Sequence, residues 1–106
     1  RGLGDVYKRQ GNNPIRVDAG LKYNPSTNVL TTGGNVMPDA DDSQDLGSSS
    51  KRWANLYTTD LNLSNEGKTN DVDGTWGDWT LQEGENKIFM INNRTGKKYS
   101  LKMEEE

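Results

Sequence analysis

The sequence of 106 residues contains no cysteine and no histidine. Disulfide bonds are therefore excluded, and so are metal sites built from thiolate or imidazole ligands and catalysis by an imidazole base. Large apolar residues are also scarce, because Leu, Ile, Val and Phe fill only 18 of the 106 positions. A small chain with so little apolar material needs disulfides, a metal or oligomerisation to support a core. Of these three, the composition favours oligomerisation.

The chain is mildly acidic, with a formal net charge of −3. This balance gives no electrostatic reason to bind nucleic acid, and no apolar run approaches the roughly 20 residues that span a bilayer. We therefore expect neither nucleic-acid binding nor membrane insertion. Phosphate-loop, nucleophile-elbow and zincin motifs are also missing. The carboxylates lie mostly in turns, without an apolar pocket to raise a pKa, so we predict no enzyme activity, no catalytic residue and no cofactor.

The first ten residues, RGLGDVYKRQ, match the translation of a widely used transposase sequencing adapter letter for letter. We interpret residues 1–10 as a non-native, adapter-derived segment that carries no information about the fold. On this interpretation, the natural protein extends further at its N-terminus.

Helical periodicity is weak along the whole sequence, whereas Gly, Asn and Thr, which favour turns and strands, are frequent. The sequence therefore predicts an all-β fold of short hairpins followed by a C-terminal meander. Residues 20–34 form the first predicted hairpin, with its turn at residues 24–27 and its end at Gly33 and Gly34. An isolated hairpin is marginal in water, so this one needs partners.

Residues 65–106 predict a three-stranded antiparallel meander, with strands that begin near Trp79, Lys87 and Lys97. A type I turn with Gly96 in the left-handed conformation joins the last two strands. The middle strand is apolar on both faces, and a lone meander covers only one of them. We therefore expect another protomer to cover the second face, with these candidate residues in the oligomer core: Ile88, Phe89, Met90 and Ile91.

Two acidic segments suggest calcium ligands, since closely spaced aspartates supply oxygen atoms. Residues 39–45 do not have the spacing of an EF-hand, because the sixth loop position is not glycine and Ser50 stands at the twelfth. Residues 71–74 are too short to argue for a metal. The sequence favours solvated loops in both places and no metal site.

A serine run, residues 48–50, predicts a cap for one helical turn over residues 51–54. Trp53, Leu56 and Tyr57 then lie on one face of that turn. Two interpretations remain open. These side chains pack in a core, for which they are further candidates in the oligomer, or they form an aromatic platform for a sugar or a neighbouring protomer.

Three stretches of the chain resemble parts of bacteriophage tail fibres. Residues 21–27 resemble a hairpin of the fibre shaft. Residues 45–57 resemble the repeat that precedes endosialidase-type intramolecular chaperones, in which the aromatic residue matching Trp53 packs near a three-fold axis. Residues 74–81, leading to residues 97–99, resemble a terminal meander of such proteins. No chaperone domain follows here, and its catalytic Ser and Lys have no matching positions, so self-cleavage is not implied.

The resemblance implies a virion structural protein, located in the tail, whose C-terminal part takes part in host attachment. It divides the chain after the adapter segment into shaft-like β repeats (residues 11–64) and the meander (residues 65–106). The implied partners are two sister chains in an intertwined homotrimer and a host-surface glycan or protein. The alternative is a small carbohydrate-binding module that uses surface tryptophans, with Trp76 and Trp79, and also Trp53, as the stacking residues.

Overall fold

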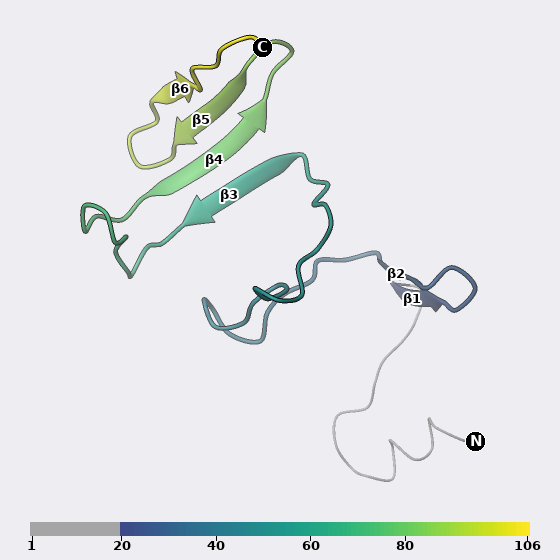
Figure 1. The fold of residues 1–106 in the computed structure, drawn as a ribbon. Helices are drawn as coiled ribbons and strands as arrows, with labels where there is room; N and C mark the ends of the chain where they lie inside the picture. Colours follow the sequence, from purple (N-terminus) through teal and green to yellow (C-terminus); the bar gives the residue numbers. More distant parts are fainter. Residues whose placement is uncertain (1–19) are drawn as a thin grey trace. The chain divides into compact units, whose positions relative to one another are not determined.

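All regular structure in the computed structural model, which describes residues 20–106, is β-structure. The predicted all-β fold is therefore confirmed (Figure 1). Residues 1–10, with the adapter interpretation, lie outside the described residues. The chain divides into two compact units, of which the first ends at Ser49 and the second runs from Ser50 to Glu106.

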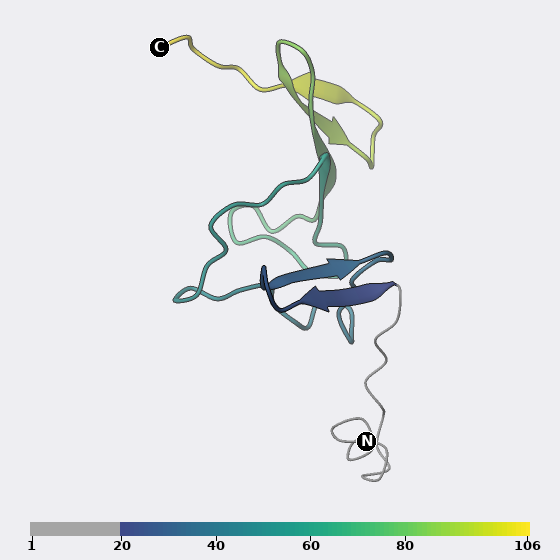
Figure 2. The same cartoon turned by 90° about the vertical axis from the view of Figure 1, so that its right-hand side faces the viewer.

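The first unit contains one hairpin, in which β1 (Leu21–Asn24) pairs antiparallel with β2 (Val29–Thr32). Figure 2 shows the two strands side by side. The Asn24 side chain accepts a hydrogen bond from the Ser26 amide at 2.9 Å, as expected for an Asn that opens a turn. Asn28 closes the turn with a φ of 59°, a conformation that Asn tolerates better than most residues. The turn predicted at residues 24–27 is thus confirmed.

The second unit contains a four-stranded antiparallel sheet in the order β3-β4-β5-β6. Its strands are β3 (Asp60–Ser64), β4 (Asp78–Glu83), β5 (Ile88–Asn92) and β6 (Lys98–Ser100).

The sequence predicted the last three strands of this sheet as a meander, and it predicted a β-like run over residues 58–63 within the shaft-like segment that ends at residue 64. In the structure, β3 instead pairs with β4 across its whole length. Apolar and polar residues alternate along β3, and its two leucines pair with apolar residues of β4. Leu61 is opposite Leu81, and Leu63 is opposite Trp79, which favours this pairing.

The turn between β5 and β6 has the predicted form. Gly96 has a φ of 78°, and its amide donates a hydrogen bond to the Asn92 carbonyl at 2.7 Å. The Asn92 side chain also accepts hydrogen bonds from the amides of Arg94 (2.9 Å) and Thr95 (3.3 Å). This turn therefore holds Arg94 in a defined place at the end of the sheet.

The helical turn predicted for residues 51–54 is wrong. Residues 51–59 have no helical or strand structure. Trp53, Leu56 and Tyr57 remain 68%, 68% and 82% exposed. A single helical turn fixes several residues for one hydrogen bond, so it needs packing to persist, and these side chains find little within the described chain.

Candidate functional site

One face of the four-stranded sheet is apolar. Side chains directly opposite one another in neighbouring strands lie on the same face of a sheet. The register aligns Leu61, Leu81, Met90 and Tyr99 in one row. We call the surface that contains this row the apolar face; it consists of Leu61, Leu63, Trp79, Leu81, Ile88, Met90, Tyr99 and Leu101.

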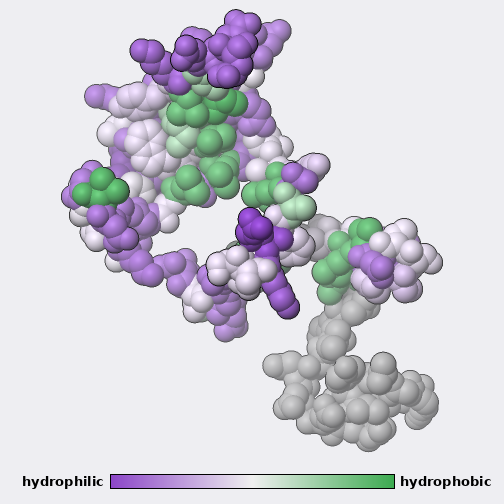
Figure 3. All heavy atoms as spheres, in the orientation of Figure 1, coloured by the Kyte–Doolittle hydropathy of each residue, from purple (hydrophilic) through white to green (hydrophobic). Residues whose placement is uncertain are grey.

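Within the second unit, no other strand packs over the apolar face. No apolar side chain among residues 20–106 is buried, and Leu61, Leu63 and Tyr99 are 36%, 49% and 47% exposed. In Figure 3 the apolar side chains gather in a band over this sheet. Monomeric soluble proteins rarely expose a contiguous apolar patch unless it serves binding. The face is therefore the main candidate for an interaction surface.

The opposite face, which we call the polar face, is held by hydrogen bonds within the chain. Thr80 is 9% exposed and is the most buried of the described residues. Its hydroxyl donates to the Asn62 side-chain oxygen at 2.6 Å and accepts from the Asn93 side-chain amide at 3.0 Å. The Asn93 amide group also donates to Asp78 at 3.0 Å. This network joins β3, β4 and the turn after β5 without help from another chain.

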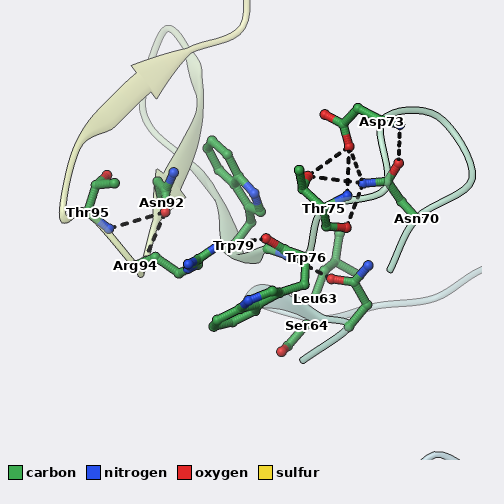
Figure 4. A pocket seen from close by; sticks show the side chains of 12 residues that line it. Leu63, Ser64, Asn70, Asp73, Thr75, Trp76, Trp79, Asn92, Arg94 and Thr95 are labelled. Carbon is green, nitrogen blue, oxygen red and sulfur yellow. Dashed lines mark hydrogen bonds between the residues drawn. The ribbon is translucent and has the colours of Figure 1, made fainter. Parts of the chain in front are cut away.

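A groove of about 740 Å³ lies at the end of the sheet where β3 ends and β4 begins. Figure 4 shows its lining side chains. They come from three sources: the row of Leu63, Trp79 and Asn92 on the sheet, the loop between β3 and β4, and the turn between β5 and β6. The full set is Leu63, Ser64, Asn65, Asn70, Asp73, Thr75, Trp76, Gly77, Trp79, Asn92, Arg94 and Thr95.

Trp76 and Arg94 form a stacked pair in this groove. The guanidinium carbon of Arg94 lies 3.8 Å from the centre of the Trp76 ring, which is cation–π contact. Its Nη1 donates a hydrogen bond to the Trp76 carbonyl at 2.9 Å. Together these two contacts fix both the indole and the guanidinium.

Trp79 has two close neighbours within the second unit. Its ring lies 5.8 Å from that of Tyr99, with the planes tilted by 46°, a favourable aromatic arrangement. The indole Nε1 also lies near Gly77, where an added Cβ would come within 2.8 Å of it. Gly77 is itself held by Asn65, whose side-chain oxygen accepts from the Gly77 amide at 2.8 Å.

The loop wall of the groove is organised around Asp73. One oxygen of its carboxylate, Oδ1, accepts hydrogen bonds from the Thr75 hydroxyl (2.7 Å), the Asn70 side-chain amide (2.7 Å) and the Thr75 backbone amide (3.1 Å). These bonds, led by the one from the Thr75 hydroxyl, lower the pKa of Asp73 below its ordinary value of 3.8. Asp73 is therefore a carboxylate at neutral pH.

The predicted oligomer-core residues are distributed over different places. Ile88 and Met90 lie on the apolar face, whereas Phe89 and Ile91 lie on the polar face. All four are half-buried. The structure does not bring Trp53, Leu56 and Tyr57 into the sheet, and they lie in the exposed segment before β3.

The predicted glycan-contact residues, Trp76 and Trp79, line one groove, whereas Trp53 is not among its lining residues. Sequence reasoning missed Arg94, which lies in the turn predicted before Gly96. The position of Gly96 predicted that turn, but the pairing of the turn with Trp76, 18 residues away, has no local sequence signal.

Among residues 20–106, acidic side chains form no cluster of three that could hold a metal ion. Residues 20–106 also contain no helix with the length and hydrophobicity of a membrane span. The groove offers a ligand aromatic rings, one guanidinium, one carboxylate and neutral polar groups. Comparisons with models of protein families, with curated proteins and with solved structures give no match.

Proposed function

We propose that the chain is a structural segment of a bacteriophage tail fibre, which assembles as a homotrimer and takes part in host attachment. The observation that carries this proposal is the uncovered apolar face of the four-stranded sheet. The apolar face is continuous over four strands, and none of the described apolar side chains is buried. A sister chain supplies a cover of the same kind, since each copy has the same face to bury.

The gain from covering this face is large on the scale of a small domain. Full burial of a Leu, Ile or Met side chain contributes roughly 1.5–3 kcal/mol. The side chains on the apolar face are already partly shielded by their neighbours, so each adds on the order of 1 kcal/mol when a partner covers it. Summed over the face, this contribution is comparable to the whole stability of a typical small domain.

Three copies, rather than two, are expected from the resemblance of residues 21–27, 45–57 and 74–81 to fibre segments. A three-fold assembly would direct each apolar face toward a common axis and leave the polar faces and loops outward. In this arrangement the sheet gives rigidity and the loops at its ends meet the host surface.

The test is the mass of the full 106-residue chain in solution, measured by size-exclusion chromatography with light scattering at micromolar concentration. We expect three times the chain mass of 11.8 kDa, with a melting temperature that rises with protein concentration. A stable monomer with cooperative unfolding contradicts the proposal.

A second candidate function is a carbohydrate-binding module. The favouring observation is that Trp76, from the loop before β4, and Trp79, from β4 itself, line one groove together with polar side chains. Binding to a glycan array that is lost in Trp76→Ala without a change in melting temperature would support this function. Trp53→Ala is the matched control, since Trp53 is exposed and does not line the groove.

A further inference from the structure

The groove contains one basic side chain, and its position suggests which kind of saccharide fits. Building on the second candidate function, we propose that the groove binds a saccharide that carries a carboxylate. The sugar ring stacks on an indole of Trp76 or Trp79, and the carboxylate pairs with the guanidinium of Arg94. In Figure 4, Arg94 extends from the β5–β6 turn toward Trp76, on the side of the groove opposite the Asp73 loop.

Arg94 is held in place but lacks an anionic partner. Its backbone amide donates to Asn92, its Nη1 donates to the Trp76 carbonyl, and its guanidinium stacks on the Trp76 ring. Within residues 20–106 it makes no ion pair. A guanidinium has five N–H donors, so most of them remain available. An arginine whose orientation is fixed in advance loses little entropy when it binds a planar carboxylate through two hydrogen bonds.

The two indoles favour a sugar over a free anion. The C–H groups of a pyranose carry partial positive charge, and the face of an indole is negative, so the two attract each other when they stack. Ligand sites of this kind combine apolar rings with a few fixed polar groups. A small inorganic anion would bind Arg94 but would contact neither the Trp76 nor the Trp79 ring.

Asp73 determines how much negative charge the groove accepts. Its Oδ2 makes no hydrogen bond with the described residues, so it is free to accept a hydrogen bond from a sugar hydroxyl. The same carboxylate repels a second negative charge, in a chain whose net charge is already −3. One guanidinium balances one carboxylate, which makes a monoanionic sugar a better fit than a dianionic sugar phosphate.

The test is calorimetric titration of the full chain with acidic oligosaccharides. The probes are an oligogalacturonate and a sialyl-oligosaccharide, each compared with its neutral methyl ester and with a phosphorylated hexose. We expect at least one acidic probe to bind, its methyl ester to bind about tenfold or more weakly, and the affinity to fall with salt. Arg94→Gln should lower the affinity for the acid to that for the ester, and Arg94→Lys should cause an intermediate loss.

Lys98→Gln is the matched control, because it removes the same charge from the polar face and should leave binding unchanged. Circular dichroism of each variant separates loss of binding from loss of fold. If Arg94→Gln fails to fold, Arg94→Lys and the methyl esters provide the test.

Equal affinity for an acid and its ester overturns the inference but leaves the carbohydrate-binding function intact. Tighter binding of the phosphorylated hexose also overturns the inference. Binding of no saccharide overturns both, and a change in oligomer mass in Arg94→Gln would then assign Arg94 to a sister chain's carboxylate.

Discussion

The two faces of the four-stranded sheet are built from the same strands but differ in what they need. On the polar face, the chain satisfies its own polar groups, because Thr80, Asn62 and Asn93 form a closed network. On the apolar face, the same chain leaves Leu61, Leu63 and Tyr99 substantially exposed. Hydrogen bonds are short-range and directional, so a few well-placed residues complete them. Burial of apolar surface needs a second layer, and the strands of the second unit do not supply one.

This difference explains how an ordered sheet exists with almost no buried side chains. The polar face and the turns fix the register of the strands, since a slip by one residue would separate the pairs joined by these bonds. The apolar face is then free to serve as an interface. A single chain fixes the register of its own strands. We propose that its stability against unfolding depends on the assembly.

The largest effect is expected from a charge on the apolar face. Met90 lies in its central row, opposite Leu81 and Tyr99. Met90→Asp would place a carboxylate inside the proposed interface. Burial of an unpaired charge there costs roughly several kcal/mol. We expect the mass measured by light scattering to fall from trimer to monomer and the melting transition to broaden.

The control for this substitution places the same charge on the other face. Ser100 is exposed on the polar face of the edge strand β6, so Ser100→Asp should keep both the mass and the melting temperature. If Met90→Asp keeps the wild-type mass while Ser100→Asp loses it, the assignment of the two faces is reversed.

The next effect tests the polar face. Thr80→Val keeps the shape of the side chain but removes the hydroxyl that links Asn62 and Asn93. Leaving their polar groups unpaired in a partly buried place costs about 2 kcal/mol. We expect a lower melting temperature at a fixed protein concentration with an unchanged oligomer mass. Thr31→Val, at an exposed position of β2, is the control and should change neither value.

Much of the fold was predictable because its signals are local. The alternation of residues 97–103, the turn that ends at Gly96 and the turn at residues 24–27 each depend on a few neighbouring residues. The pairing of β3 with β4 was not predicted, because β4 begins 14 residues after β3 ends and the intervening loop has no strand pattern. The helical turn over residues 51–54 was wrong for the opposite reason, since a local signal was too weak without packing.

The candidate site was predictable only in part. The sequence indicated Trp76 and Trp79 because tryptophan is enriched at binding surfaces, and the structure places both, half-buried, in one groove. The contact of Arg94 with Trp76 depends on how the β5–β6 turn lies against the start of β4, which follows from the complete sheet and from no nearby residue.

A smaller effect is expected where the apolar face meets the groove. In Gly77→Ala, the new methyl group would come within 2.8 Å of the Trp79 Nε1, so the indole has to move. Such overpacking costs about 1 kcal/mol, and we expect a shift in tryptophan fluorescence with a small loss of stability. Gly34→Ala is the control, because an added Cβ there meets nothing within 4 Å. Identical spectra for the two variants would contradict the contact between Gly77 and Trp79.

The smallest effect concerns the loop wall of the groove, which resembles the polar face in completing its own hydrogen bonds. The Thr75 hydroxyl is the main cause of the lowered pKa of Asp73. Because the folded state has the lower pKa, the stabilisation is complete above the ordinary value of 3.8 and is lost as the pH falls through the folded value. Carboxyl-carbon NMR should therefore show Asp73 titrating below pH 3.8, and Thr75→Val should raise its midpoint toward 3.8 while Thr31→Val leaves it in place. A wild-type midpoint at or above 3.8 would contradict the hydrogen bonds to Asp73 and mean that the loop is open in solution. Only the sheet, and not the loop, would then complete its own hydrogen bonds.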